Sequence, residues 1–211
     1  DPEFNKKASF LARLGSGSAA RSIEGPVTLW GNNKAQVDSS DLYAIPFGKN
    51  LHPIFTDFQD TIILVDTERK AVSSSKGHEL MLNHPFSDQR FLQAENNLAN
   101  LFHVMQTGDL DEFIKIVETE ALSLHAMMMT SNPYFILMQP NTLEIIYRVC
   151  EFRKKTQTPL CFTLDAGANL HLLYPKSIKK NVRAFISEHL VTYCQNGQYL
   201  FDEVGSGAKK V

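Results

Sequence analysis

A short apolar segment in the middle of the chain, residues 61–66, constrains the fold more than any other feature. It reads Thr-Ile-Ile-Leu-Val-Asp, a continuous apolar run that is shorter than a typical helix. Runs of this kind, rich in β-branched residues, are typical of strands buried on both faces. The segment therefore predicts a fully buried strand, and the remaining elements have to be arranged around it.

The elements that follow this strand predict the fold class. Apolar spacing and turn residues predict helices over 78–83, 87–107, 109–129, 140–155 and 176–194, and strands over 160–164, 170–174 and 198–201. From residue 61 the main order is strand, three long helices, two strands, helix, strand. This order predicts an α+β sandwich with helices on one face of a mainly antiparallel sheet. Upstream, a helix is predicted over 8–14 and again from 18 to 23, with short strands over 27–30 and 43–47.

Size and charge exclude several classes of protein. The 211 residues are 43% hydrophobic, enough for a packed core in one large domain or parts of two. Lys and Arg number 21 against 23 Asp and Glu, a net charge of -2 that argues against a nucleic-acid surface. No apolar run approaches the roughly 18 residues of a membrane span, and no signal peptide is recognisable. Three scattered cysteines without a C-x-x-C pair predict a reduced, cytoplasmic compartment.

Residues 15–22, Gly-Ser-Gly-Ser-Ala-Ala-Arg-Ser, form the first candidate site. Two glycines precede a predicted helix start, where free N–H groups and serine hydroxyls suit an anion such as a phosphate or carboxylate. Arg21 lies three residues after Ser18, so both side chains can face the same side of the first turn. A guanidinium in that position can bind a carboxylate or phosphate in a fork. A small-residue linker followed by an N-cap serine explains the segment equally well.

Two further segments carry candidate chemistry. Asp165 follows the predicted strand over 160–164 and is itself followed by Ala-Gly, so it is either a base at a strand end or an ordinary turn residue. Residues 72–78, Val-Ser-Ser-Ser-Lys-Gly-His, form a hydroxyl-rich loop before a helical stretch, and an exposed, capped serine loop is the alternative. His78-Glu79 does not open a zinc motif because Leu82 stands where H-E-x-x-H requires histidine.

Together these segments resemble one family. Residues 11–22, Leu-Ala-Arg-Leu-Gly-Ser-Gly-Ser-Ala-Ala-Arg-Ser, are similar to the serine-rich loop and helix of the mevalonate diphosphate decarboxylases of the GHMP kinase superfamily. Residues 162–169, Phe-Thr-Leu-Asp-Ala-Gly-Ala-Asn, resemble the family's Asp-Ala-Gly-x-Asn segment, and residues 70–77 resemble the loop between its two domains. His125-Ala126 falls where the family has a similar dipeptide in a long helix. Order and approximate spacing agree over nearly the whole chain.

The resemblance implies a domain organisation. Residues 60–211 are expected to be the C-terminal domain, a ferredoxin-like α/β sandwich of the GHMP kinase type. Residues 1–59 are expected to be the end of the N-terminal domain, which is ribosomal S5-like, with residues 1–4 (Asp-Pro-Glu-Phe) a cloning scar. The chain is therefore predicted to be the C-terminal portion of a longer protein. The family also contains many homodimers, which makes a homodimer the assembly to test.

The same resemblance implies a reaction and roles for individual residues. The reaction is the ATP-dependent decarboxylation of (R)-5-diphosphomevalonate to isopentenyl diphosphate, with ATP as co-substrate and Mg²⁺ as cofactor. Asp165 is expected to lie beside the tertiary hydroxyl as base or orienting group, and Arg21 to hold the substrate carboxylate. Ser16 and Ser18 are expected to contact substrate and phosphate groups, and Ser74 to line the phosphate path.

Some features depart from the family pattern. Glu24-Gly25-Pro26 replaces the usual aromatic-Gly-Gly run, and Ser75 stands where some members carry arginine. The chain lacks the family's lysine- and tyrosine-containing substrate motif and its main glycine-rich ATP loop, so it is predicted to be inactive by itself. Two alternatives fit the same sequence: a GHMP kinase that phosphorylates a mevalonate-like hydroxyl without decarboxylation, and a non-catalytic homologue that serves as an interaction module.

Overall fold

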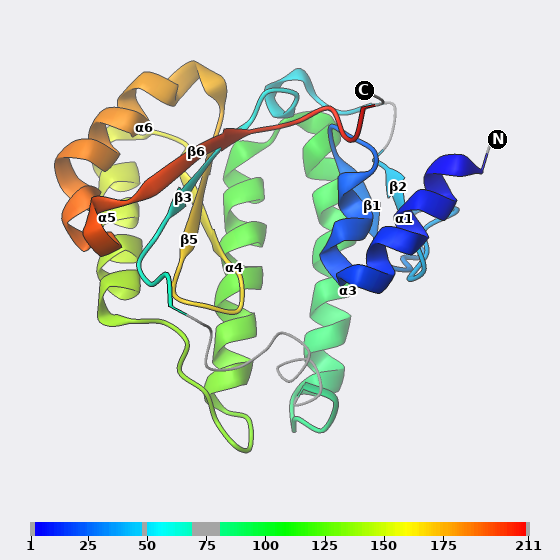
Figure 1. The fold of residues 1–211 in the computed structure, drawn as a ribbon. Coiled ribbons are helices and arrows are strands. Elements are labelled where there is room, and N and C mark those ends of the chain that lie inside the picture. Colours follow the sequence, from blue (N-terminus) through cyan, green and yellow to red (C-terminus); the bar gives the residue numbers. More distant parts are fainter. Residues whose placement is uncertain (1–2, 48–49, 69–80, 210–211) are drawn as a thin grey trace. The chain divides into compact units, whose positions relative to one another are not determined.

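The computed structural model describes residues 3–47, 50–68 and 81–209 (Figure 1). The chain forms two compact units. The larger runs from Asp57 to Glu203, and the smaller comprises Asp1–Thr56 and Val204–Val211. That these units correspond to the two domains of the family stays a prediction.

The larger unit is a four-stranded antiparallel sheet packed against helices. The strands lie in the order β4-β5-β3-β6, and every neighbouring pair is antiparallel. The elements along the chain are β3 (Gln59–Ile63), α3 (Ser87–Thr107), α4 (Leu110–Met129), α5 (Pro140–Thr156), β4 (Cys161–Leu164), β5 (Leu170–Tyr174), α6 (Lys179–Phe185) and β6 (Tyr199–Glu203). The predicted α+β class and the main order of elements are confirmed. Of the helix predicted over 78–83, the first three residues lie outside the described residues, and Met81 and Leu82 are helical.

The helices begin and end where the capping residues predict. Gly108 ends α3 in the left-handed conformation, with φ of 81°, which glycine adopts without a steric penalty. The next residue, Asp109, caps α4 by accepting a hydrogen bond from the backbone N–H of Glu112 at 3.0 Å. The helix predicted over 176–194 is present but changes type along its length: α6 gives way to a π-helical turn over Ile186–Leu190, in which Ile186 and Leu190 are both fully buried.

Strand β3 differs from its prediction in both burial and bounds. Its burial alternates: Gln59, Thr61 and Ile63 are buried, whereas Asp60 and Ile62 are only partly buried on the other face. The prediction of a strand buried on both faces is therefore wrong. The ladder also stops at Ile63, because the backbone N–H groups of the two residues after Leu64 bind a side chain of the β4–β5 loop instead of continuing the sheet.

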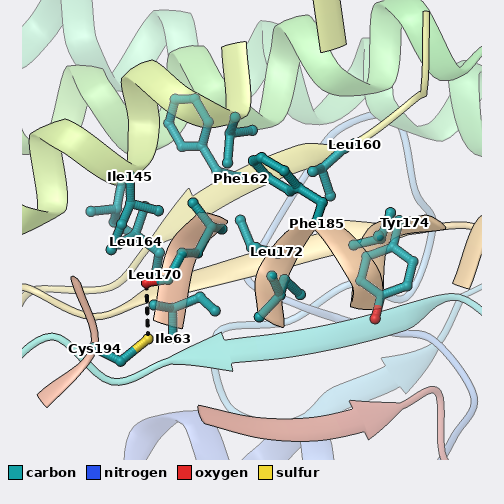
Figure 2. Close-up of a cluster of buried hydrophobic side chains, with 14 of the residues drawn as sticks. Ile63, Ile145, Leu160, Phe162, Leu164, Leu170, Leu172, Tyr174, Phe185 and Cys194 are labelled. Atoms are coloured by element: carbon teal, nitrogen blue, oxygen red, sulfur yellow. Dashed lines mark hydrogen bonds between the residues drawn. The ribbon is translucent and has the colours of Figure 1, made fainter. Parts of the chain in front are cut away.

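One face of the sheet meets the helices in a continuous hydrophobic core (Figure 2). Ile63, Leu170 and Leu172 contribute fully buried side chains from the sheet, and Ile145 contributes another from α5. Burying an aliphatic side chain of this size stabilises a fold by about 1.5–3 kcal/mol. The core therefore fixes β3 and β5 against α5, and it orients the ends of these strands where the candidate site lies.

The smaller unit is built from short elements. They are α1 (Phe4–Gly15), a 3-10 helix (Gly17–Ser22), β1 (Thr28–Trp30) and β2 (Ala44–Pro46), with β1 and β2 antiparallel. The buried Ser9 hydroxyl joins them, because it donates to the carbonyl of Ala20 and accepts from the N–H of Ala44, both at 2.8 Å. The C-terminal segment belongs to the same unit through a bridge between Glu24 and Gly207.

Candidate functional site

The candidate site is a cavity of about 550 Å³ at one end of the sheet of the larger unit. Its wall comes from the residues that follow β3, the segment before α5, the β4–β5 loop and His171 of β5. This volume lies within the range of ligand pockets, about 300–1,000 Å³. Asp165, the predicted base, lines this cavity.

The backbone of Asp165 is held in place while its carboxylate is left free. The carbonyl oxygen of Asp165 accepts a hydrogen bond from Nε2 of His125 at 3.1 Å and another from the N–H of Gly167 at 2.7 Å. The Asp165 side chain is exposed and makes no hydrogen bond or ion pair with the described residues. Asp165 is therefore both a turn residue and a carboxylate that is available to a ligand.

The hydrogen bond to a carbonyl defines the state of His125. A carbonyl oxygen only accepts, so Nε2 of His125 carries the hydrogen. His125 is 1% exposed, and burial lowers its pKa, an effect that the hydrogen bond to Asp165 opposes in part. A neutral His125 in α4 thus anchors the β4–β5 loop.

Two polar side chains fix the rest of this loop. Oδ1 of Asn169 accepts hydrogen bonds from the N–H groups of Val65 and Asp66, at 2.8 and 2.9 Å, and so binds the segment after β3 to the loop. The fully buried hydroxyl of Thr142, in the first turn of α5, donates to the carbonyl of Ala168 at 2.7 Å. Elements from three parts of the chain therefore hold the loop that carries Asp165.

An aspartate–histidine pair lies on the same wall. Nδ1 of His171 donates to Oδ2 of Asp60 at 2.8 Å, and both side chains are about a quarter exposed. The hydrogen bond to Asp60 raises the pKa of His171 against the opposing effect of burial, and the negative charges of Asp60, Asp165 and Asp202 add to it. His171 is the only basic side chain among the described residues that line the cavity.

Three of the other predicted site residues lie in the smaller unit. All three are exposed: Ser16 lies between α1 and the 3-10 helix, and Ser18 and Arg21 lie within that helix. Ser16 is the N-cap residue of the 3-10 helix, but its side chain makes no capping hydrogen bond. Ser18 lies inside the helix and does not cap it either. The helix predicted to restart at residue 18 is present as a 3-10 helix, in which the Ala19 N–H donates to the carbonyl of Ser16.

The structure thus groups some of the predicted residues and not others. Ser16, Ser18 and Arg21 share one short segment, while Asp165 lies on the cavity of the larger unit. Ser74 lies outside the described residues. The Arg21 guanidinium makes no hydrogen bond or ion pair within the described ranges, so it is available to bind an anion.

The described residues do not supply a metal centre or a reactive thiol. Within residues 3–47, 50–68 and 81–209 no three His, Cys, Asp or Glu side chains are placed to hold a metal ion. The cysteines Cys150, Cys161 and Cys194 are free thiols, and burial raises the pKa of each. Of the helices described, none has the length and hydropathy to cross a membrane.

Sequence reasoning missed the Asp60–His171 pair and the contacts of Asn169. His171 stands between Leu170 and Leu172 of β5, and Asp60 precedes the apolar run of β3; alternation along each strand places both on the face away from the core. That alternation was a usable signal. The tie from Asn169 to the end of β3 spans more than one hundred residues of sequence, and no local pattern indicates it.

Comparison with known proteins identifies the family to which the chain is similar. The family model described as "Mevalonate 5-diphosphate decarboxylase C-terminal domain" matches residues 61–208. A diphosphomevalonate decarboxylase of Ganoderma lucidum is 26% identical over 97% of this chain and 51% of its own length. That of Saccharomyces cerevisiae is 28% identical over 88% of this chain and 47% of its own length. The chain thus spans about half the length of these curated relatives.

Solved structures give the same result. The mevalonate diphosphate decarboxylase of Staphylococcus aureus superposes with a TM-score of 0.81 and 28% identity, over 96% of this chain and 59% of that one. A structure described as MDDEF in complex with MVAPP, AMPPCP and magnesium superposes with a TM-score of 0.82, also at 28% identity, over 96% of this chain and 59% of that one. The family match covers more than half of the chain, and the chain therefore belongs to the mevalonate 5-diphosphate decarboxylase C-terminal domain family.

Proposed function

We propose that the protein to which this chain belongs is an ATP-dependent carboxy-lyase that converts (R)-5-diphosphomevalonate to isopentenyl diphosphate, CO2, ADP and phosphate. The observation that carries the proposal is the Asp165 carboxylate. It lies free on a cavity wall, its backbone is anchored by His125, and it stands in a segment that matches the decarboxylase family. The chain spans about half of its relatives, so the activity belongs to the longer protein.

The chemistry assigns Asp165 two tasks. A tertiary alcohol is a weak nucleophile, and a carboxylate beside it can orient it and accept its proton as its oxygen takes the γ-phosphoryl group of ATP. The new phosphate ester then leaves with the C–O electron pair, and the C–C bond electrons of the departing carboxylate form the double bond as CO2 is released. The positive charge that develops at the tertiary carbon is stabilised by the same carboxylate.

The exposed segment of the smaller unit supplies the anion contacts of the proposal. The Arg21 guanidinium holds the substrate carboxylate in a two-point contact, which orients it for loss as CO2. Ser16 and Ser18 donate hydroxyl hydrogen bonds to substrate and phosphate oxygens, and Ser74 lines the phosphate path. Residues 1–59 are proposed as the end of the nucleotide- and substrate-binding domain, and residues 60–211 as the C-terminal domain.

ATP and Mg²⁺ enter the proposal in different ways. ATP is the co-substrate that supplies the phosphoryl group, in line with the AMPPCP named for a similar structure. The described residues offer no three-ligand set for Mg²⁺, so no step is assigned to the ion here. A cytoplasmic location, a homodimeric assembly and the lack of nucleic-acid or membrane partners stay predictions.

The test measures products with the longer protein that contains this chain. Incubation with ATP and diphosphomevalonate should release CO2 and ADP in equal amounts, and Asp165→Asn should reduce the rate by at least about 100-fold. Asp111→Asn, which changes an exposed aspartate in the first turn of α4, is the matched control and should retain wild-type turnover. ADP release without CO2 would identify a GHMP kinase, and no turnover at all would identify a non-catalytic homologue; either result contradicts the proposal.

A second experiment tests which substrate the protein prefers. A phosphomevalonate decarboxylase of Haloferax volcanii is 23% identical over 79% of this chain, so monophosphorylated and diphosphorylated substrates should be compared directly. We expect a higher kcat/KM for the diphosphate. The 211-residue chain alone should release no CO2 from either compound, and turnover by this chain would contradict the predicted need for the rest of the protein.

A further inference from the structure

One part of the cavity wall comes from the connection between α4 and α5. Ile136 and Leu137 of this connection line the cavity together with Asp165. Ile136 is 65% exposed, although it is a large aliphatic residue, and it belongs to neither a helix nor a strand. Its side chain therefore offers apolar surface on the cavity wall, and covering that surface with an apolar part of a ligand is favourable.

Hydrogen bonds hold this connection at both ends. The N–H of Phe135 donates to the carbonyl of Met128, near the end of α4, at 2.9 Å. The N–H of Gln139 donates to the hydroxyl of Thr142 at 3.1 Å, and that hydroxyl donates in turn to the carbonyl of Ala168 in the β4–β5 loop. The three residues between these two anchored positions therefore form a fixed part of the wall.

The connection lies beside the loop that carries the Asp165 carboxylate. Leu137 and Ala166 both pack against one cluster of buried methionines. The cluster consists of Met81, Met127 and Met128. Ile136 precedes Leu137 in the chain and Asp165 precedes Ala166, and both line the cavity. The apolar side chain and the carboxylate are therefore held on adjoining parts of one wall.

The charges of the wall favour an uncharged group of the ligand at this place. Asp66, Glu68 and Asp165 line the cavity, and none of the described lining residues is Lys or Arg. His171, the one histidine of that lining, already binds an aspartate. A diphosphate placed here would face three carboxylates, which repel it. The group that fits between Asp165 and Ile136 is one with a hydroxyl and a small hydrocarbon surface.

We propose that Ile136 is a specificity-determining residue: its side chain contacts the methyl group on the tertiary carbon whose hydroxyl Asp165 orients. This inference rests on the proposed function of Asp165, and it names the part of the substrate that the cavity selects. A methyl group covers the apolar surface of Ile136, whereas a hydrogen atom in its place leaves that surface to water. An apolar contact of this size supports discrimination of several-fold or more.

The first test compares two substrates in the longer protein that contains this chain. One is diphosphomevalonate, and the other is its analogue with hydrogen in place of the methyl group. Ile136→Ala should lower the ratio of their kcat/KM values, methyl over hydrogen, by about 3- to 10-fold, and Ile136→Val should keep the ratio within about 2-fold of wild type. The intrinsic difference between a tertiary and a secondary alcohol is the same in every variant, so it cancels when the ratios are compared.

Leu143→Ala is the matched control. Leu143 is an aliphatic residue of α5 that is 54% exposed and lies outside the lining of the cavity, so its removal should leave the ratio unchanged. A structural effect of Ile136→Ala would lower kcat/KM equally for both compounds. An unchanged ratio in Ile136→Ala, or an equal change in Leu143→Ala, would overturn the inference.

A second measurement separates this inference from the proposed function. Calorimetric titration without ATP should show that the methyl compound binds the longer wild-type protein more tightly than the analogue, and Ile136→Ala should remove most of the difference. Equal affinities in the wild type, or no binding of either compound, would overturn the inference. Absence of CO2 release rejects the proposed function, whereas CO2 release with an unchanged substrate ratio in Ile136→Ala rejects only the role of Ile136.

Discussion

His125 of α4 donates a hydrogen bond from Nε2 to the backbone carbonyl oxygen of Asp165, across 3.1 Å, and so links a buried helix residue to the loop that carries the proposed base. The contact is to the backbone, which leaves the Asp165 carboxylate free for a ligand. Because His125 is buried and neutral, the link depends on pH in a direction that can be stated.

The pH dependence of stability should carry the signature of His125. Burial lowers the pKa of His125 in the folded protein. Between the folded and unfolded pKa values, the unfolded chain therefore carries a proton on this residue and the folded chain does not. Stability is fully present above the unfolded pKa of about 6.5 and falls as pH drops below it, by about 1.4 kcal/mol for each unit of lowering. Urea unfolding of the wild type and of His125→Leu at pH 7.5, 6.5 and 5.5 measures this.

His125→Leu should remove that part of the loss at acid pH, although it is less stable than the wild type at pH 7.5 because the hydrogen bond to Asp165 is gone. His189→Leu controls for the general effect of removing a histidine, since His189 is exposed. Equal pH slopes for His125→Leu and the wild type would contradict the assignment of a neutral, buried ring.

The pair Glu118 and Arg153 should be a stabilising centre of the larger unit. Arg153 binds both oxygens of Glu118, at 2.6 and 2.9 Å, and also donates to the carbonyl of Leu160 at 2.7 Å. Oε1 of Glu118 accepts from the N–H of Phe162 at 3.2 Å, so the pair joins α4 and α5 to the edge strand β4. Glu118→Ala leaves a half-buried guanidinium and a strand N–H without this partner.

We expect Glu118→Ala to lower the free energy of unfolding by about 2–4 kcal/mol, measured by chemical denaturation. Glu112→Ala is the matched control on the same helix. Its partner Lys115 is largely exposed, so this variant should cost less than about 1 kcal/mol. Similar losses in the two variants would show that Glu118 is no more important than a surface charge.

The side chain of Asn169 should stabilise the segment that follows β3. Its Oδ1 atom accepts from the N–H groups of Val65 and Asp66. Asn169→Ala leaves both donors without this partner and should cost about 1–3 kcal/mol, while Asn169→Asp keeps the accepting oxygens and should cost less. Hydrogen exchange at the two amides measures the effect directly. Unchanged protection of these two amides against exchange in Asn169→Ala would contradict their hydrogen bonds to Asn169.

Gly17 should tolerate a side chain less well than Gly15. A Cβ atom at Gly17 would lie 3.0 Å from Cη2 of Trp30, whereas one at Gly15 would meet nothing within 4 Å. Gly17→Ala is therefore expected to displace Trp30 and to cost about 1 kcal/mol. Gly15→Ala should be neutral or stabilising by up to about 1 kcal/mol.

Trp30 is the only tryptophan of the chain, so its fluorescence reports on the smaller unit. The emission maximum and the unfolding midpoint should shift in Gly17→Ala and stay close to wild type in Gly15→Ala. A stabilised Gly17→Ala variant with unchanged emission would show that the ring moves aside at no cost.

The sequence predicted well the features that depend on local chemistry. Gly108 and Asp109 mark the end of one helix and the start of the next, because a left-handed residue and a side-chain cap act within a few residues. The apolar strands and the order of elements followed from the same short-range patterns. Strand β3 was misjudged because Leu64 and Val65 continue its apolar run after the ladder has ended.

The candidate site likewise combines features that the sequence predicts with contacts that only the tertiary structure shows. The sequence by itself determined which residue types are available: Asp165 after a strand, and Ser16, Ser18 and Arg21 on a glycine-rich segment. Only the tertiary structure decided that His125 holds Asp165 and that Asp60 holds His171 on the same cavity wall. The physical reason is that a hydrogen bond or a charge interaction depends on distances in space, and these contacts join residues 40 and 111 positions apart in the chain.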